Sequence, residues 1–419
     1  MTKEYTSLGL MSGTSGDGVD ASIIISDGET KYKAIKDKYF EYDNDIYHNI
    51  HNLKEKIHTI KDLTKLYEES NYLEKQITLF HAKIINDLTK KYEIDIVGFH
   101  GQTIYHCSQE KISKQLGDGK LLSQLIKKNI VYNFRQNDIK NGGEGAPLAP
   151  IFHQIVVTNK KIDLPVCILN IGGISNITET VKWEDFYRPN VFNTIRACDI
   201  APGNCLIDEW VRKKSKNKFD SDGGLAKIGK TDGLILNQAL ENFNVGPPYK
   251  ESLDVNNFDI SFVKGLSLED GASTLTDFTA AQIAKALVYS GGKSGSSIWL
   301  VCGGGRKNKY LMESITNQGA EHLKIKNFKH QKTDKNASYE EWLDDAILHS
   351  WDQSYNTAIE NFKEIVLLPV EKYGIDGDFV ESQAFAYLAI RSFLKLPISF
   401  PDTTGCKEPA TGGKIVKNF

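Results

Sequence analysis

Near its start the chain reads Leu8-Gly-Leu-Met-Ser-Gly-Thr-Ser-Gly-Asp-Gly-Val-Asp-Ala-Ser-Ile-Ile-Ile25. Two apolar runs flank a turn of Gly, Ser, Thr and Asp, a pattern that predicts a β-hairpin with an unusually polar tip. Glycines in the tip permit a tight turn and let a ligand approach the backbone, while its hydroxyls and the carboxylates of Asp17 and Asp20 suit phosphate and Mg²⁺. The tip is therefore a candidate phosphate cradle, and the alternative is a plain turn, since the same residues suit turn geometry.

The composition limits the class of protein. A length of 419 residues allows two domains, and 40% hydrophobic residues, 25% charged residues and a net charge of −3 are typical of a globular protein that binds neither nucleic acid nor an anionic membrane. The first residues lack a signal-peptide pattern, and no apolar run reaches the roughly 18 residues of a membrane helix, so we expect a cytoplasmic protein. Six cysteines without C-x-x-C spacing predict free, buried thiols.

The first half contains two further candidate sites. Apolar residues at steps of three and four from Leu73 to Leu88 predict a long amphipathic helix. A short strand over 94–98 then leads into His100, Gln102 and His106, at the end of a strand where α/β sheets tend to bind ligands. Glutamine and neutral imidazoles suit a substrate rich in hydroxyls or amides, whereas the alternative is a pair of structural histidines.

Arg135 precedes a glycine cluster at 142–145. Its guanidinium can form a two-pronged contact with a carboxylate or phosphate, and the cluster is either a loop pressed against a ligand or a linker between lobes. The second half begins with strands over 166–171 and 174–178 that flank Gly172-Gly173. This repeats the pattern of the first hairpin, and the two turns could grip a polyphosphate from both sides of a cleft.

The remaining candidates follow in the second half. Asp199 precedes a Pro-Gly turn and an apolar helical start, so it is either a helix cap or a general base. A buried strand over 298–302 ends in Gly303-Gly304-Gly305, which would suit a base or ribose lying against bare backbone, or else a tight turn. Glu381 is a polar residue near the start of an Ala-rich helix that follows Gly374.

The ordered set of these motifs resembles the anhydro-N-acetylmuramic acid kinase family, of the sugar kinase, actin and Hsp70 superfamily. The motifs that carry the resemblance are Gly9-Leu-Met-Ser-Gly-Thr-Ser-Gly-Asp-Gly-Val-Asp20, His100-Gly-Gln-Thr-Ile-Tyr-His106, Phe134-Arg-Gln-Asn-Asp138, Gly142-Gly-Glu-Gly-Ala-Pro-Leu148, Asn170-Ile-Gly-Gly-Ile-Ser-Asn-Ile177, Asp199-Ile-Ala-Pro-Gly-Asn204, Thr274-Leu-Thr276, Val301-Cys-Gly-Gly-Gly305 and Val380-Glu-Ser-Gln-Ala-Phe-Ala386. They span nearly the whole chain in the family's order.

The resemblance implies a two-lobed α/β, actin-like ATPase and sugar kinase fold, with a mixed sheet flanked by helices in each ribonuclease-H-like lobe. Residues 1–150 would form the N-terminal lobe, completed by about 385–419, and residues 151–384 the C-terminal lobe. The implied reaction uses ATP, Mg²⁺ and water to open 1,6-anhydro-N-acetylmuramic acid, and it yields N-acetylmuramic acid 6-phosphate and ADP in cell-wall recycling. A homodimer is expected as well.

The same matching assigns roles to residues. Asp199 matches the family's catalytic base, and His100, Gln102, Arg135 and Glu381 are expected at the sugar, with Arg135 on its lactyl carboxylate. Asp17 is the expected Mg²⁺ ligand. The positions expected to bind ATP are Gly13, Thr14, Ser15, Gly16, Asp17, Gly18, Val19, Asp20, Gly172, Gly173, Gly303 and Gly304.

Two other functions remain open on the sequence alone. One is a kinase of the same fold that acts on another sugar, and the other is an ATP-binding regulator without catalysis. The chain also departs from the family's usual residues: it has Gly16 in place of Leu, Asn133 in place of Asp, and Ile200-Ala201 in place of Thr-Gly beside the base.

Overall fold

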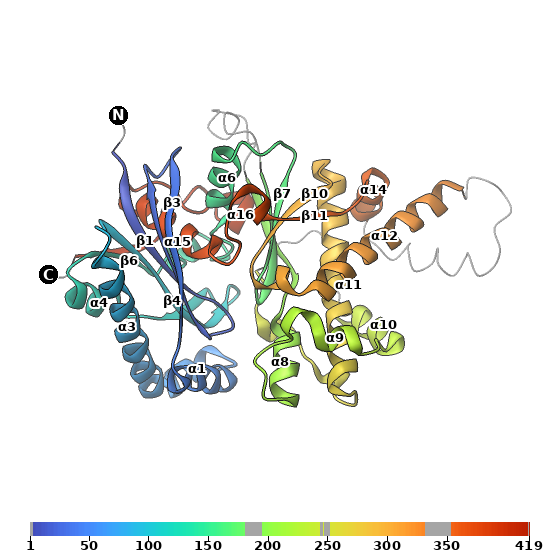
Figure 1. Ribbon diagram of the computed structural model, residues 1–419, viewed down its shortest axis with the longest axis horizontal. Helices are drawn as coiled ribbons and strands as arrows, with labels where there is room; N and C mark the ends of the chain where they lie inside the picture. Colours follow the sequence, from blue (N-terminus) through green and yellow to red (C-terminus); the bar gives the residue numbers. More distant parts are fainter. Residues whose placement is uncertain (1–2, 181–194, 244–245, 247–251, 332–352, 418) are drawn as a thin grey trace. The chain divides into compact units, whose positions relative to one another are not determined.

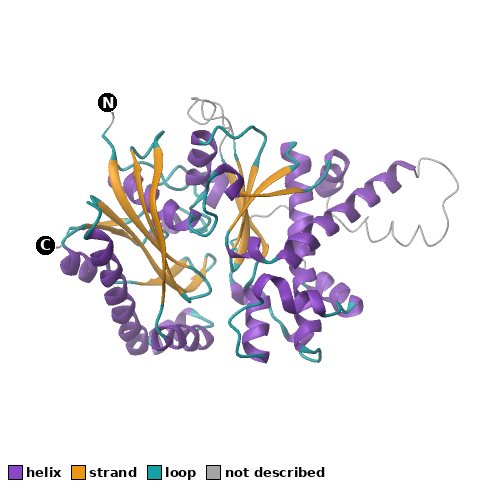
Figure 2. Ribbon diagram, viewed as in Figure 1, coloured by secondary structure: helices purple, strands orange, loops and turns teal. Residues whose placement is uncertain are grey.

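The structure is a computed structural model that describes residues 3–180, 195–243, 246, 252–331, 353–417 and 419 (Figure 1). The chain forms two compact units: unit 1 comprises Met1–Ile162, Thr180–Cys198 and Tyr373–Phe419, and unit 2 comprises Asp163–Glu179 and Asp199–Lys372. Each unit contains a mixed β-sheet with helices packed around it (Figure 2). The α/β fold class expected from the sequence is confirmed. The functional lobes at 1–150 with 385–419 and at 151–384 remain a proposal.

The described part of unit 1 is built on a seven-stranded sheet, in which the order is β12-β6-β4-β1-β2-β3 and β5 pairs with β4. The hairpin strands β1 and β2 are antiparallel, whereas β1–β4 and β4–β6 are parallel pairs. The C-terminal strand β12 pairs with β6, so the end of the chain belongs to this unit. The strands are β1 (Tyr5–Ser12), β2 (Gly18–Ser26), β3 (Tyr32–Glu41), β4 (Ile96–Cys107), β5 (Ile112–Leu116), β6 (Asn129–Tyr132) and β12 (Lys414–Val416).

The helices of unit 1 cover this sheet, and two of them were expected from the sequence. The predicted amphipathic helix is α3, in which Leu73, Ile77, Ile84 and Leu88 are buried and Phe80 of the same stripe is half-buried. Helix α15 lies so close to β1 that a Cβ added at Gly9 would be 2.0 Å from a backbone oxygen of the helix. The helices are α1 (Asn44–Lys56), α2 (Ile60–Lys65), α3 (Tyr67–Thr89), α4 (Gly119–Ile126), α5 (Gln136–Lys140), α6 (Pro150–Asn159), α15 (Val380–Phe393) and α16 (Pro401–Thr404).

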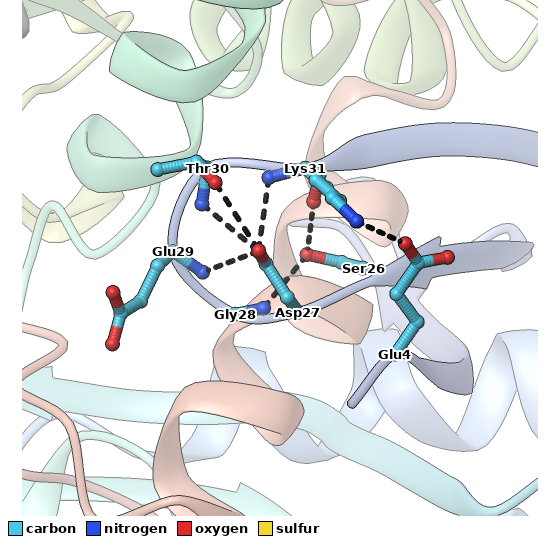
Figure 3. A network of polar contacts seen from close by, with 7 residues as sticks. All are labelled: Glu4, Ser26, Asp27, Gly28, Glu29, Thr30 and Lys31. Carbon is cyan, nitrogen blue, oxygen red and sulfur yellow. Dashed lines mark hydrogen bonds and ion pairs between the residues drawn. The ribbon is translucent and has the colours of Figure 1, made fainter. Parts of the chain in front are cut away.

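The turn between β2 and β3 shows how a buried carboxylate holds a loop in unit 1 (Figure 3). Asp27 Oδ1 accepts hydrogen bonds from the backbone N–H groups of Glu29, Thr30 and Lys31, each at 2.9 Å. Burial alone would raise the pKa of Asp27, but these three donors and the Thr30 hydroxyl, which donates to Oδ2 at 3.1 Å, together outweigh it and lower the pKa below its usual value. The ionised carboxylate therefore fixes the turn near neutral pH.

One strand differs from the sequence prediction. The pattern places a strand at 94–98 with His100 to His106 beyond its end, yet β4 continues from Ile96 to Cys107. The strand continues because β5 pairs with its second half in the antiparallel direction, from Gln102 to Cys107. His100, Gln102 and His106 are consequently strand residues, and that part of the prediction is wrong.

Unit 2 contains a five-stranded sheet in the described residues, in the order β11-β10-β7-β8-β9. Strand β10 is parallel to both β7 and β11, and β7 and β8 form the predicted antiparallel hairpin. The strands are β7 (Cys167–Ile171), β8 (Ile174–Glu179), β9 (Arg196–Pro202, which belongs to unit 2 from Asp199 onward), β10 (Ile298–Cys302) and β11 (Val366–Pro369). The helices are α8 (Cys205–Lys214), α9 (Gly224–Ile228), α10 (Gly233–Asn242), α11 (Leu268–Ser294), α12 (Lys309–Gln331) and α14 (Gln353–Asn361).

The predicted helix after Asp270 is α11, which is buried along most of its length and forms the centre of the helical layer of unit 2. None of the six cysteines forms a disulfide, as predicted, and four of them are buried as expected, whereas Cys107 and Cys198 are half-buried. Among the described residues, none of the helices is both long enough and apolar enough to cross a membrane.

Candidate active-site residues

The tip of the β1–β2 hairpin is held by side chains from outside the hairpin. Gln102 of β4 donates from Nε2 to the carbonyl oxygen of Gly13 at 3.0 Å, and its Oε1 accepts from the Ser12 hydroxyl at 2.5 Å. Lys54 of α1 donates from Nζ to the carbonyl oxygen of Thr14 at 2.8 Å. Gln102 is fully buried, and its bond with Ser12 is buried as well, whereas Gly13 is half-buried. The tip is therefore a supported loop and not a freely moving turn.

Two glycines are required by this geometry. Gly16 has a φ of +61°, in the left-handed region, and its N–H donates to the carbonyl oxygen of Gly13 at 3.2 Å. A Cβ added at Gly18 would lie 2.5 Å from the hydroxyl oxygen of Tyr39. Both glycines are buried, so they let the tip pack closely against its neighbours. At the half-buried Gly13, in contrast, a Cβ would have only Ser15 Oγ within 4 Å, at 3.9 Å, so the backbone there is open to phosphate oxygens. Thr14 and Ser15 are exposed at the tip, and Val19 is buried beneath it.

Asp17 provides a carboxylate at the tip of the hairpin. It is half-buried, and its Oδ1 accepts a hydrogen bond from the Ser15 hydroxyl at 2.5 Å. Within the described residues, no group of three or more His, Cys, Asp or Glu side chains is placed to hold a metal ion. A Mg²⁺ ion bound through nucleotide phosphates needs only one or two protein carboxylates, and Asp17 fits that requirement.

His100 and Arg135 meet in the interior of unit 1. His100 is only 3% exposed, and its Nδ1 lies 2.8 Å from the carbonyl oxygen of Gly101. Arg135 donates to His100 Nε2 from Nε at 3.3 Å and from Nη2 at 3.0 Å. Burial, and then the charge of Arg135, keep the pKa of His100 well below its usual value. The imidazole is therefore neutral, and both of its nitrogens have protein partners.

The glycine cluster at 142–145 is tied to Arg135. Arg135 donates from Nη1 to the carbonyl oxygen of Gly145 at 2.9 Å, and the Gly145 N–H donates to the carboxylate of Asp138 at 2.7 Å. Asp138 is buried and also accepts from the Thr404 hydroxyl at 2.6 Å. The cluster is thus an ordered loop within unit 1 that helps to place the guanidinium.

Glu381 lies in the first turn of α15 and is half-buried. Phe385 lies four residues further along the helix, so the two side chains share one face of α15. The ring of Phe385 packs against the imidazole of His100 with 4.5 Å between the ring centroids. The structure therefore places Glu381 on the helix face that contacts the site around His100.

In unit 2, Gly172 and Gly173 form the turn of the β7–β8 hairpin and contact the segment before α8. The N–H groups of Gly203 and Asn204 donate to the carbonyl oxygens of Gly173 and Gly172, both at 2.8 Å. A Cβ added at Gly203 would lie 2.2 Å from the Gly172 oxygen. The two turns are locked together by backbone hydrogen bonds.

Gly303 and Gly304 follow β10, the parallel neighbour of β7, so they lie at the same edge of the sheet as Gly172. Gly303 has a φ of +80°, and a Cβ added there would be 2.5 Å from Asn170 Oδ1. The nearest atom to a Cβ at Gly304 would be Asn204 Nδ2 at 3.8 Å. The glycine turns of unit 2 therefore converge at the carboxyl ends of adjacent parallel strands, where α/β sheets bind ligands.

Asp199 lies within β9, a few residues before Gly203. It is 7% exposed, and its Oδ2 accepts hydrogen bonds from the Ser252 hydroxyl and the Leu253 N–H, both at 3.0 Å. The alternative role as a cap of α8 is wrong, because Asn204 occupies the N-cap position of that helix. Asp199 is thus a buried carboxylate on a strand, oriented by two donors and next to the glycine turns.

A sequence profile described as anhydro-N-acetylmuramic acid kinase matches residues 5–347 and 356–418. The chain belongs to the anhydro-N-acetylmuramic acid kinase family. An anhydro-N-acetylmuramic acid kinase of Pelagibacter ubique is 51% identical over 424 residues, with 100% of each chain covered. One of Rhodospirillum rubrum is 33% identical over 413 residues, which cover 97% of this chain and 92% of the relative. The resemblance inferred from the motifs is confirmed.

A solved structure, a ROK family glucokinase from Streptomyces griseus in complex with glucose and AMPPNP, is similar over 92% of this chain and 99% of its own. Its sequence identity is 10% and its TM-score is 0.39, which is too low to support an inference about function. The functional assignment therefore depends on the family match and on the residues of this chain.

Sequence reasoning missed several residues that support the site of this family member. Lys54 holds the hairpin tip, and Asp138 holds the 142–145 loop. Gly203 and Asn204 donate backbone hydrogen bonds to the turn at Gly172. Asp138, Gly203 and Asn204 lie inside the quoted motifs, so their position in those motifs was a usable signal. Lys54 lies in a lysine-rich segment with no such signal. The departures Ile200 and Ala201 are both fully buried in β9 beside Asp199.

Proposed function

We propose that this chain is an ATP-dependent kinase that hydrolytically opens 1,6-anhydro-N-acetylmuramic acid and phosphorylates its O6, giving N-acetylmuramic acid 6-phosphate and ADP. The observation that carries the proposal is the match to the anhydro-N-acetylmuramic acid kinase profile over nearly the whole chain. The relative with 51% identity over its full length bears the same name. Recycling of peptidoglycan and catabolism of amino sugars are the setting of such a reaction.

Asp199 is our candidate for the general base. Water must attack the anomeric carbon while the bond from that carbon to O6 breaks and O6 takes the γ-phosphoryl group, so one proton has to leave the water. The carboxylate of Asp199 is buried, and Ser252 and Leu253 both donate to its Oδ2. These donors fix its orientation, which supports the transfer of the water proton to a carboxylate oxygen as in inverting glycosidases.

The sugar contacts that we propose lie in unit 1. Arg135 would bind the lactyl carboxylate, because a guanidinium offers two parallel N–H donors to a carboxylate. Glu381 would accept a hydrogen bond from a sugar hydroxyl, since it lies on the face of α15 that contacts His100. Gln102 lies nearby on β4, but both ends of its amide already contact the hairpin tip.

The nucleotide contacts that we propose are the glycine turns. Residues 13–20 would bind phosphate oxygens, because the hydroxyls of Thr14 and Ser15 are exposed and the backbone at Gly13 is open to a ligand. Gly172, Gly173, Gly303 and Gly304 would bind the nucleotide at the edge of the sheet of unit 2. Asp17 would hold Mg²⁺. When bound, the ion would spread the charge of the phosphoryl group during transfer.

We also infer a cytoplasmic homodimer, on the basis of family membership. Light scattering of the purified full-length chain tests the oligomeric state, and a monomer at micromolar concentration would contradict the inference. Fractionation of expressing cells tests the location.

The test of the proposed function is ADP release with ATP, Mg²⁺ and 1,6-anhydro-N-acetylmuramic acid, with mass spectrometry of the product. We expect a sugar phosphate that has gained one water and one phosphoryl group. Plain N-acetylmuramic acid is the comparison substrate, because its phosphorylation needs no attack by water at the anomeric carbon. Turnover of the plain sugar alone would favour a kinase that acts on another sugar. ATP binding without turnover of either sugar would favour a non-catalytic regulator.

A further inference from the structure

The tautomer of His100 follows from its contacts. A carbonyl oxygen only accepts hydrogen bonds, so Nδ1, at 2.8 Å from the Gly101 oxygen, must carry the hydrogen. The ring is neutral because burial and Arg135 depress its pKa. Nε2 is then an acceptor, and it receives the N–H groups of both Nε and Nη2 of Arg135. Both nitrogens of His100 are therefore used to orient protein groups.

The guanidinium of Arg135 is fixed on two sides. His100 takes the edge formed by Nε and Nη2, and Gly145 takes Nη1 through its carbonyl oxygen. Gly145 is itself held by the buried carboxylate of Asp138. A guanidinium held in this orientation can still offer the second N–H groups of Nη1 and Nη2 to a carboxylate in a two-pronged contact.

We propose that His100 is a positioning residue for Arg135: it holds the Nε–Nη2 edge so that the Nη1–Nη2 edge meets the carboxylate of the substrate. His100 thus acts through Arg135 and does not contact the sugar, in contrast to the role expected from the sequence. This proposal rests on the proposed function, because it takes the lactyl carboxylate as the ligand of Arg135. Selectivity for sugars that carry the lactyl group would follow from this fixed orientation.

The test measures the dissociation constant of 1,6-anhydro-N-acetylmuramic acid by calorimetry in the full-length chain and in four variants: His100→Phe, His100→Gln, Arg135→Ala and the double variant His100→Phe with Arg135→Ala. We expect His100→Phe to weaken binding about tenfold, the usual effect of losing an oriented, charge-assisted hydrogen bond. His100→Gln keeps an acceptor and should recover part of the loss. In the Arg135→Ala background, His100→Phe should have no further effect.

A second sugar separates positioning from direct contact. 1,6-Anhydro-N-acetylglucosamine lacks the lactyl carboxylate, so its inhibition constant should be the same for the native chain and His100→Phe. If His100→Phe weakens this sugar as well, or still weakens the first sugar in the Arg135→Ala background, His100 contacts the ligand directly and the proposal is wrong.

Folding is controlled with a matched histidine. His81 is fully buried in the same unit, its Nδ1 lies 2.8 Å from the Ile77 oxygen, and its Nε2 has no hydrogen-bond partner. His81→Phe should perturb packing to a similar degree and leave the dissociation constant unchanged. A loss of sugar binding in His81→Phe equal to that in His100→Phe would overturn the proposal, because it would assign the effect to general packing.

One readout does not depend on the sugar. The Nε–H signal of Arg135 in a ¹H–¹⁵N spectrum should be protected from exchange in the native chain, lost in His100→Phe and recovered in His100→Gln. An unchanged signal in His100→Phe would contradict the positioning role. If the signal responds as expected but the native chain binds neither sugar, the proposed substrate is wrong while the contact between His100 and Arg135 stands.

Discussion

The side-chain amide of Gln102 donates to the backbone oxygen of Gly13 at 3.0 Å, across 89 residues of sequence. The contact exists because β1 and β4 are parallel neighbours, with Ser12 in register with Gln102. A buried amide on one strand therefore sets the position of a glycine-rich turn at the end of the other. This arrangement makes the shape of the turn depend on β4 and not on the hairpin alone.

Gln102→Leu should raise the KM for ATP about tenfold, because the tip would lose its hydrogen bonds from the buried amide, each worth roughly 1 kcal/mol. The measurement is initial rate against ATP concentration at saturating sugar. Gln115→Leu, which removes a similar amide on the neighbouring strand β5, should leave the KM for ATP unchanged. Equal effects of the two variants would show that the tip does not depend on Gln102.

Asp199→Asn should lower kcat by about a hundredfold or more, since general-base catalysis typically contributes that much. The affinity for ATP should stay within about twofold of the native value by calorimetry. Asp232→Asn is the control in the same unit, because Asp232 caps α10 through two backbone N–H groups and asparagine is an equally good cap. Full activity in Asp199→Asn would exclude this carboxylate as the base.

Gly203→Ala should disrupt the locked turns of unit 2, because its Cβ would lie 2.2 Å from the backbone oxygen of Gly172. We expect a loss of about 1–3 kcal/mol in the free energy of unfolding, the usual cost of overpacking. Gly233→Ala, at a helical position where a Cβ would meet no atom within 4 Å, should be neutral or slightly stabilising. Urea denaturation of both variants checks the prediction, and equal midpoints would contradict it.

Two buried histidines, His81 and His153, and two half-buried ones, His106 and His322, should make the fold sensitive to mild acid. Burial lowers the pKa of His81, His106, His153 and His322 to about 4. Their pKa in the unfolded chain is about 6.5, so the unfolded state binds more protons between these values. The contribution of the neutral rings is therefore fully present above pH 6.5 and is lost as the pH falls toward 4.

The pH effect can be measured as the urea midpoint at pH 7.5 and pH 5.0. The native midpoint should fall at pH 5.0, and His81→Phe should reduce that fall, by an amount on the order of 1–2 kcal/mol in the free energy of unfolding. The exposed His58 is the matched control, and His58→Asn should not change the pH dependence. A native midpoint that is the same at both pH values would contradict the prediction.

The local sequence pattern was enough to predict the elements whose structure depends on residues close together in the sequence. The alternation of apolar runs with Gly, Ser and Asp predicts both hairpins, and they are β1–β2 and β7–β8. The 3.6-residue period from Leu73 to Leu88 predicts α3. These features were predictable because side-chain periodicity and the backbone freedom of glycine act within a few residues.

The local pattern was not enough to predict the end of β4 or the surroundings of Asp199, because both depend on residues far away in the sequence. The polar residues after Gly98 suggested the end of a strand, but β5 pairs with Gln102 to Cys107 and extends β4. At Asp199 the sequence left a helix cap and a general base open. The structure shows that Asn204 is the N-cap of α8 and that Ser252 and Leu253 donate to the Asp199 carboxylate. These partners lie outside the stretch of sequence around each segment, so the local pattern could not predict the contacts.

The sequence by itself determined the family, the candidate base and the glycine turns, because each depends on residue types in a fixed order along the chain. Only the tertiary structure decided which atoms meet: Gln102 with Gly13, and His100 with Arg135. These pairs are formed by strand pairing and by burial between residues far apart in sequence. Which groups form a hydrogen bond in a buried site depends on the residues that surround them in the folded chain, and the order of residues along the chain does not show which residues these are.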